Sequence, residues 1–459
     1  MSQEKFDSLR KNYPVFRYKD FKIECNGKSV LLSHSFEISG LCAFSATNRV
    51  SLDGFELAND PQSPLAKKIA FYLGMVEAVS YLKSCCCPVM EVECGQLSDR
   101  ETDWFKRLYM GGLGEFFHIN DINTTFDDFL TINSLKNAPE WQSCSISPVK
   151  LRDLSLVPVG GGKDSCVTIE LVKEVNRSIA FLTVNSQKAR TDTVLAAGFN
   201  KDKIINIERK IDPALLELNK QGFLNGHTPF SAVVAFLSYF TAYIIGSPYI
   251  VLSNESSAGQ GNLEGADVNH QYSKSPEFEK SFCEFADERL SKSIHYFSIL
   301  RPFNELQIAK RFAAFPAYHK IFRSCNRGSK QNIWCCDCAK CLFVYIILSP
   351  FLSEGELTSI FGENLLDKAS LDSDFDGLVG FTPLKPFECV GTREEVCLAL
   401  SLTAQKSGEK LPYLLKKFVS ECPSIDSDNA DLLRFYGDDS NIPEVFRPAV
   451  SEMYNYVSG

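Results

Sequence analysis

A run of three glycines followed by lysine, aspartate and serine is the segment best suited to bind an anion. The glycines are Gly160, Gly161 and Gly162. They follow the apolar run LSLVPV and precede the helical pattern CVTIELVKEV, so bare backbone can turn tightly and direct N–H groups at a phosphate. Lys163 can add a positive charge, Asp164 can hold Mg²⁺ or cap the helix, and Ser165 can donate its hydroxyl. We therefore expect GGGKDS to be a phosphate-binding loop; a glycine turn with Asp164 and Ser165 as helix caps is the alternative.

Four of the 17 cysteines have the spacing of a metal site. They are Cys325, Cys335, Cys338 and Cys341. C-x-x-C turns present two sulfurs to one ion, and four thiolates form a closed tetrahedral zinc site without a position for activated water. The sequence predicts structural Zn²⁺ here, with Cys336 as a spare thiol; buried or redox cysteines without metal are the alternative. The triplet Cys85 to Cys87 lacks this spacing, and we expect it to pack within a strand.

A polar segment directly follows the apolar run YIVL. It is SNESSAGQGNLEGADVNHQYSKS, residues 253–275, and it is rich in Asn, Ser, Gly, His and Lys. An α/β sheet places its ligand-binding loops after strands, so this segment is a candidate for the reacting centre. A solvated surface loop has the same composition and is the alternative.

The elements that must position these residues alternate regularly from residue 154 onward. Apolar runs typical of buried parallel strands, LSLVPV, SIAFLTVN, KIINIER, YIVLSNE and HYFSIL, are separated by helical patterns. This alternation predicts an α/β fold with an open parallel sheet, right-handed crossovers and a ligand at the carboxyl ends of the strands.

One stretch, residues 229–252, has no charged residue and is long enough to cross a bilayer. Its serines, threonine and Gly-Ser-Pro sequence instead favour a buried helix, a turn and a strand at residues 249–252. We therefore expect no stable membrane insertion.

Composition changes along the chain predict three domains. Residues 1–148 combine strand-like runs such as SVLLSHSFEI and CCCPVMEVEC with the helical pattern SPLAKKIAFYLGMVEAVSYLKS, which predicts an α+β domain that contributes to substrate binding. Residues 149–350 hold the glycine loop and the four cysteines, and residues 351–459 form a mainly helical extension.

The overall charge argues against a nucleic-acid partner. The net charge is -9, from 57 acidic and 48 basic residues, so no broad basic field attracts a phosphate backbone. The first residues, MSQEKFDSLRKNYP, do not resemble a signal peptide, and we expect a cytoplasmic protein with reduced thiols.

The glycine loop carries the first family resemblance. VPVGGGKDS resembles the SGGxDS loop of the PP-loop ATP-pyrophosphatase superfamily (adenine nucleotide α-hydrolase-like), with Gly160 in place of the first serine. The resemblance implies cleavage of ATP to AMP and diphosphate with Mg²⁺, and places Asn185 and Ser186 near the adenosine. The loop followed by a four-cysteine motif is also similar to 7-cyano-7-deazaguanine synthases, which adenylate a carboxylate.

Further segments extend the likeness to most of the chain. SNE…VNHQYSKS, RPFNELQIAK, RSCN…CAKC and GFTPLKPFECVGTREE resemble the MurL family of UDP-N-acetyl-α-D-muramoyl-L-alanyl-L-glutamate epimerases. This resemblance implies ATP-dependent inversion of the terminal L-Glu of UDP-MurNAc-L-Ala-L-Glu to D-Glu through an acyl-adenylate, for peptidoglycan synthesis. Adenylation removes the carboxylate charge that opposes loss of the α-proton.

The same resemblance suggests roles for the polar residues. We expect His270 to be the proton base, with Glu255 and Lys274 as the next candidates, and Asn254 and Asn269 beside them. Candidates for the substrate's diphosphate or carboxylates are Arg301, Arg323 and Lys385.

Three other functions remain open at this point. An amide or nitrile synthetase would capture the adenylate with ammonia. A tRNA-thiolating or lysidine-type PP-loop enzyme is disfavoured by the acidic balance. A zinc-stabilised nucleotide-binding regulator would bind ATP without turnover.

Overall fold

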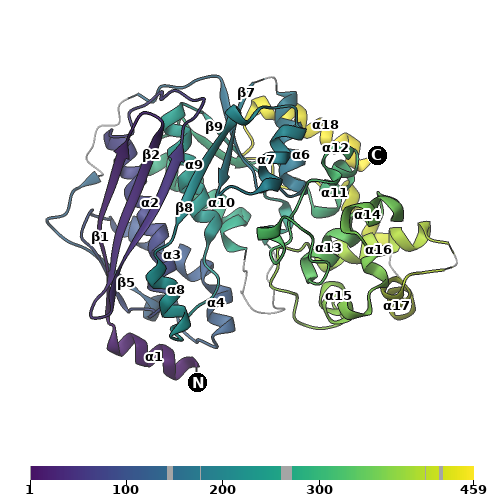
Figure 1. The fold of residues 1–459 in the computed structure, drawn as a ribbon, viewed down its shortest axis with the longest axis horizontal. Coiled ribbons are helices and arrows are strands. Elements are labelled where there is room, and N and C mark those ends of the chain that lie inside the picture. The colour runs from purple at the N-terminus through teal and green to yellow at the C-terminus, as the bar shows by residue number, and fades with distance from the viewer. Residues whose placement is uncertain (1, 142–147, 176, 260–270, 409, 423–426) are drawn as a thin grey trace. The chain divides into compact units, whose positions relative to one another are not determined.

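The chain folds into two compact units, each made of several separate segments. The computed structural model describes residues 2–141, 148–175, 177–259, 271–408, 410–422 and 427–459 (Figure 1). The first unit comprises Met1–Leu156, Ile205–Ile250 and Asp267–Tyr296. The second comprises Val157–Ile204, Val251–Ala266 and Phe297–Gly459. The boundaries predicted at residues 148 and 350 stay predictions.

The sheet of the first unit combines antiparallel and parallel pairs. Its strands are β1 (Val15–Cys25), β2 (Ser29–Ile38), β3 (Cys42–Ser51), β4 (Val89–Val92), β5 (Thr131–Ser134) and β8 (Ile204–Lys210). They follow the order β8-β3-β2-β1-β4-β5, antiparallel from β8 to β1 and parallel from β1 to β5. Alternate residues of β2 are buried, including Leu32, Phe36 and Ile38, because successive side chains of a strand point to opposite faces.

Two apolar helices, α2 (Pro64–Leu82) and α9 (Phe230–Ile245), pack against each other in the first unit, and α2 also packs on β1 and β2 (Figure 1). The other helices described in this unit are α1 (Ser2–Asn12), α3 (Asp99–Gly112), α4 (Gly114–Ile119), α5 (Phe126–Phe129), α8 (Pro213–Lys220), η4 (Tyr272–Lys274) and α10 (Pro276–Arg289). Aromatic rings join α3, α9 and α10, with the ring centroids of Trp104 and Phe285 4.4 Å apart.

A buried ion pair ties α2 to the sheet of the first unit. The Glu77 carboxylate, fully buried on α2, accepts hydrogen bonds from Arg209 Nε at 2.9 Å and Arg209 Nη2 at 2.5 Å. Asn48 Nδ2 on β3 donates to the same carboxylate at 3.1 Å. Burial alone would raise the pKa of Glu77, but the Arg209 charge and these hydrogen bonds lower it overall.

The uncharged stretch 229–252 has the predicted division. Helix α9 ends at Gly246, whose φ of 77° is the left-handed conformation that glycine supplies at helix ends, and β9 (Tyr249–Leu252) follows. Among the described residues, no helix combines the length and the apolar character needed to cross a membrane.

The second unit contains β7 (Ser178–Val184) and the carboxyl ends of three strands that begin in the first: β6 (Leu154–Pro158), β9 and β10 (His295–Ser298). These four follow the order β10-β9-β6-β7, and β6 is parallel to β9. The loops that follow β6 and β9 therefore lie at the same edge of the sheet. β7 lies on one side of β6 and β9 on the other, so the strand order changes direction at β6. Such a point is where α/β sheets bind ligands.

In the second unit α11 (Glu305–Ala313) packs on α6 (Lys163–Glu174), α13 (Ala339–Leu348) and α18 (Arg447–Ser458). The remaining α-helices described in this unit are α7 (Lys188–Ala196), α12 (Pro316–His319), α14 (Glu354–Phe361), α15 (Asp372–Val379), α16 (Arg393–Lys406) and α17 (Tyr413–Glu421). In Figure 1, α13 to α17 gather together, and the described elements of residues 351–459 are helical as predicted.

The α/β class and the predicted strands are confirmed, but two local predictions are wrong. Cys85, Cys86 and Cys87 are fully buried, yet they lie in the turn between α2 and β4 rather than in a strand, and Cys86 has a φ of 49°. Lys163, expected in the loop, is the first residue of α6. The loop proper is therefore confined to residues 159–162.

Candidate functional site

Glycine is required at the centre of the loop between β6 and α6. Gly161 has a φ of +85°, and a Cβ there would lie 3.1 Å from the backbone nitrogen of Arg190. Gly162 is the N-cap residue of α6 and has an extended backbone, and no side chain caps the first N–H groups of this helix. The Gly160 N–H instead donates to Ser165 Oγ at 3.0 Å, so the alternative in which Asp164 and Ser165 act as helix caps is wrong. The loop presents bare backbone at the positive end of α6.

Lys163 lies beneath this loop and is paired within the protein. It is 3% exposed, and its ammonium group donates to the carboxylates of Asp164 and Glu305. Burial would lower the pKa of Lys163, but the two carboxylates raise it above its ordinary value. The charge of Lys163 is therefore already compensated. One ammonium group and two carboxylates meet at the first turn of α6.

Glu305 is the first residue of α11, and its carboxyl group is as deeply buried as the lysine. Burial raises the pKa of Glu305 to about 7, although Lys163 opposes the shift and Asp164 adds to it. Burial thus opposes the charged form of Glu305, and the pair with Lys163 supports it.

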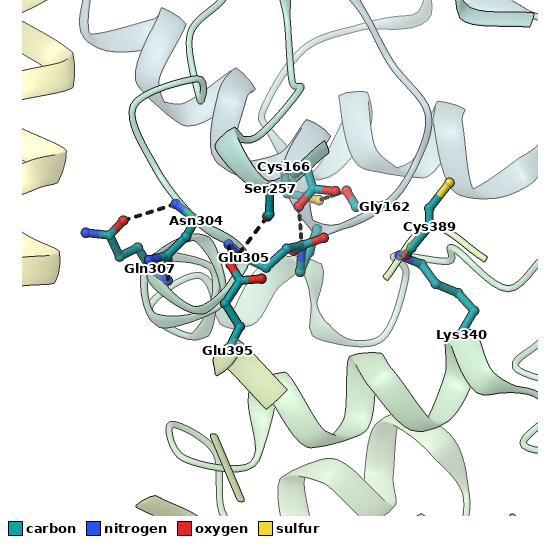
Figure 2. A network of polar contacts seen from close by, with 11 residues as sticks. Gly162, Cys166, Ser257, Asn304, Glu305, Gln307, Lys340, Cys389 and Glu395 are labelled. Carbon is teal, nitrogen blue, oxygen red and sulfur yellow. Dashed lines mark hydrogen bonds and ion pairs between the residues drawn. The ribbon is translucent and has the colours of Figure 1, made fainter. Parts of the chain in front are cut away.

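Glu395, on α16 of the helical extension, holds Glu305 in place (Figure 2). One of its oxygens accepts the backbone N–H of Glu305 at 2.7 Å and faces Ser257 Oγ at 3.4 Å, and the other accepts the N–H of Thr392 at 2.5 Å. A Cβ at Gly391 would lie 2.4 Å from this carboxyl group, so a larger residue there would displace the Glu395 carboxylate. Burial, and then the neighbouring Glu305, raise the pKa of Glu395 to about 7.

Three further buried cations belong to the same unit. Arg301 follows β10, and its Nη1 donates to the Glu255 carbonyl oxygen at 2.6 Å. Lys340, between two cysteines of the metal motif, donates to the Cys389 carbonyl oxygen (Figure 2). Lys385 is 6% exposed, and the nearby acidic residue Glu255 is 8% exposed.

The structure brings together some of the predicted residues. Arg323 contacts the loop through its backbone N–H, which donates to the Gly161 carbonyl oxygen at 2.8 Å, while its guanidinium binds the Phe322 and Asn332 carbonyl oxygens. Asn254 Nδ2 donates to Ser298 Oγ at 3.1 Å.

The other predicted residues are less closely tied to the loop. Asn185 and Ser186 are exposed after β7, and Asn185 has a φ of 57°. Lys274 lies in η4 of the first unit, so its role stays a prediction. Asn269 and His270 lie outside the described residues.

Sequence reasoning missed Glu305, Glu395 and Lys340. Glu305 lies within the capping box formed by Asn304 and Gln307, and Glu395 is itself part of the capping box that begins at Thr392. In the sequence both patterns indicate only the start of a helix. The signal that distinguishes Glu305 is a carboxylate at the first position of a largely buried helix face.

The four predicted cysteines form one cluster. Their sulfur atoms all lie within 4.8 Å of one another, and Gly328 N–H donates to Cys325 Sγ at 3.2 Å. Cys336 Sγ donates instead to the Phe361 carbonyl oxygen at 3.2 Å, which confirms that it is outside the cluster. Four converging thiols with a backbone N–H to one sulfur fit a closed tetrahedral site and are compatible with structural Zn²⁺.

The fold and this site define an α/β protein with a glycine loop before α6, a buried cluster of Lys163, Asp164 and Glu305, and a cysteine cluster of the metal-binding type. Comparison with protein families matches residues 7–299 to the MurL N-terminal domain and residues 321–432 to the MurL C-terminal domain. The chain belongs to the MurL family.

Two relatives carry the same name, UDP-N-acetyl-alpha-D-muramoyl-L-alanyl-L-glutamate epimerase. The protein from Xanthomonas oryzae pv. oryzae is 33% identical over 369 residues, which cover 78% of this chain and 79% of the relative. The protein from Salinispora tropica is 33% identical over 361 residues, or 76% of each chain.

Proposed function

We propose that this protein is the epimerase that inverts the terminal L-Glu of UDP-MurNAc-L-Ala-L-Glu to D-Glu in peptidoglycan precursor synthesis. The observation that carries the proposal is family membership over both MurL domains, joined to relatives named for this reaction. A cytoplasmic location is part of the proposal, because this substrate is a nucleotide-linked precursor.

We further propose that ATP drives the inversion by activating the carboxylate. The backbone N–H groups of the loop and the start of α6 suit the ATP phosphates. Asp164 and Glu305 offer hard oxygen ligands for Mg²⁺, which would neutralise phosphate charge when bound. Lys163 would hold the two carboxylates in place, and Asn185 with Ser186 would approach the adenosine.

The activated substrate explains why an ATP site serves an epimerase. Loss of the α-proton beside a carboxylate places two negative charges on adjacent groups. The acyl-adenylate lacks the first charge and accepts the electron pair into its carbonyl, so a side-chain base can remove the proton and the opposite face can receive another. Hydrolysis then releases the product and AMP.

Asn254 and Glu255 after β9, and Arg301 after β10, are the candidates from the second unit around the reacting carbon. Asn269, His270 and Lys274 remain proposed members, with His270 as a base. Arg323 is kept as a candidate for the substrate's anionic groups. Zn²⁺ at the cysteine cluster would hold the segment before α13 in place, without contact to the reaction.

The test is incubation of the purified protein with ATP, Mg²⁺ and UDP-MurNAc-L-Ala-L-Glu in D₂O, with AMP, glutamate chirality and α-deuterium measured together. We expect AMP and α-deuterated D-Glu. AMP without inversion, and with consumption of added ammonia, would assign the chain to an amide-forming synthetase instead. No AMP from folded protein would favour a nucleotide-binding regulator.

A matched pair of variants links the reaction to the loop. Lys163→Met removes the buried cation at the start of α6, and Lys173→Met removes a half-exposed lysine, paired with Glu170, from the last turn of the same helix. We expect Lys163→Met to lose AMP formation and Lys173→Met to keep it, with circular dichroism to verify the folding of both.

A further inference from the structure

One buried lysine of the second unit has no hydrogen-bond or ion-pair partner among the described residues. Lys385 is 6% exposed, and within the part of the chain that the structure describes its ammonium group makes no hydrogen bond or ion pair. The two other buried lysines of the second unit are satisfied: Lys163 by two carboxylates and Lys340 by a carbonyl oxygen. Lys385 is therefore the exception among the described buried lysines of this unit.

A largely buried lysine without an ion pair loses much of the hydration of its ammonium group, which costs free energy. Burial lowers the pKa of Lys385, an effect that Glu395, Glu255 and Glu394 oppose and Arg393 strengthens. The environment thus shifts the protonation equilibrium of Lys385 toward the neutral amine, which is the form of lysine that accepts a proton.

The segment that carries Lys385 is held in place beside the buried carboxyl group of Glu395. It runs from the end of α15 to the start of α16, and Arg393 Nη2 holds it by donating to the Thr382 and Pro383 carbonyl oxygens at 2.8 and 2.7 Å. Farther along, Cys389 accepts the hydrogen bond from Lys340, and Gly391 lies against Glu395. Lys385 is thus held by contacts at both ends of its segment, close enough to Glu395 and Glu255 for their charges to act on it.

We propose that Lys385 is the acid–base residue for one face of the α-carbon of the activated glutamyl group. This rests on the proposed function. The neutral amine takes the α-proton, the C–H electron pair moves into the acyl carbonyl to give an enolate, and an ammonium group is formed. A second group returns a proton to the opposite face, for which Glu255 is the described candidate. In the reverse direction the Lys385 ammonium supplies the proton.

The test uses the full-length protein, Lys385→Met and Lys385→Arg, with ATP, Mg²⁺ and either epimer of the UDP-MurNAc-dipeptide in D₂O. AMP formation reports activation of the carboxylate, and α-deuterium reports proton transfer. We expect both variants to make AMP within a few-fold of the wild-type rate. α-Deuterium incorporation should fall by about 10² to 10⁴ from one epimer and survive from the other, because the base of the opposite face remains.

A lysine with a purely structural role would give a different pattern. Loss of AMP and of exchange from both epimers in parallel would overturn the proposal, as would unchanged exchange from both, or loss of exchange from both with AMP retained. Lys417→Met, which removes a partnered lysine of the same helical extension, is the control and should change neither readout. Wild-type protein that makes no AMP would defeat the proposed function, a result distinct from failure of the Lys385 assignment.

The pH profile supplies an independent measurement. For the sensitive epimer, the wild-type rate of α-deuterium incorporation should rise with pH, because the amine must be neutral to accept the proton. This rising limb of the pH profile should lie below the ordinary lysine pKa of 10.5. The limb should be absent from the residual rate of Lys385→Met. A limb that persists in this variant would contradict the proposal.

Discussion

The carboxylate of Glu395 accepts the backbone N–H of Glu305 at 2.7 Å, and the Glu305 carboxylate pairs with Lys163 at the start of α6. These three residues come from the helical extension, from α11 and from the helix that follows the glycine loop. A residue of the extension therefore fixes the backbone of Glu305, the residue that holds Lys163 at the start of α6. Substitutions in the extension should therefore alter the position of Lys163 beside the glycine loop through Glu395 and Glu305.

The first prediction concerns Glu395. Glu395→Ala removes the acceptor of the Glu305 N–H, and hydrogen bonds to charged groups contribute about 1.5–3 kcal/mol, so the rate of AMP formation should fall about tenfold or more. Glu356→Ala is the matched control, because Glu356 closes the same kind of capping box with Ser353 on an exposed helix of the same unit. Both variants lose a cap of about 1 kcal/mol, but only the first should lose activity. Equal rates of AMP formation would refute the link from Glu395 to the loop.

The second prediction concerns the pH dependence of stability. The pKa of Glu395 is raised from its ordinary 4.5 to about 7 in the folded protein, so the folded state binds more protons between these values. This group's contribution to stability is complete below pH 4.5 and is lost as the pH rises through about 7, on the order of 3 kcal/mol in total. Urea unfolding across this range should show a flatter pH dependence for Glu395→Gln. Glu444→Gln, at an exposed side chain, should keep the wild-type slope.

The third prediction concerns the cysteine cluster. Cys338→Ser removes one of four converging sulfurs, so bound zinc measured by atomic absorption should fall well below one ion per chain and the melting temperature should drop. Cys336→Ser alters the adjacent spare thiol, which faces the Phe361 carbonyl oxygen, and should keep the full zinc content. Identical zinc contents in the two variants would rule out the assigned ligand set.

The fourth prediction concerns the buried pair of the first unit. Arg209→Met leaves the Glu77 carboxylate buried without its cation, which should cost about 3–5 kcal/mol of unfolding free energy. Arg107→Met breaks a pair with Asp103 in which the arginine side chain is 67% exposed, and should cost less than about 1 kcal/mol. Urea titrations of both variants give the comparison, and a similar loss in each would mean that burial does not govern the strength of these pairs.

Elements defined by local patterns were predictable from the sequence. The apolar runs at β6, β7, β8, β9 and β10 are strands because their composition suits burial on a sheet, and the Gly-Ser-Pro sequence ends α9 as expected. The cysteine cluster was also predictable, since C-x-x-C spacing already constrains the sulfurs locally. The start of α6 was placed too late because a lysine and an aspartate in a first helical turn look the same in sequence as loop residues.

The carboxyl cluster was not predictable for a different reason. Glu305 and Glu395 are separated by the whole cysteine segment, residues 325–341, and by the first part of the extension. Each occupies a position that a helix start explains by itself. Only the fold brings the Glu395 carboxylate to the Glu305 N–H. Lys385 likewise has no local signature, because burial without a partner is a property of the folded environment.

The interleaving of the two units has a consequence for synthesis of the chain. Glu77 and α2 leave the ribosome long before Arg209 on β8 and the helix α9 that packs on α2. Until those segments emerge, the nascent first unit carries an uncompensated carboxylate and an uncovered apolar helix face. Its folding must therefore wait for chain made after the first part of the second unit, and a fragment that ends near residue 148 would keep both defects permanently.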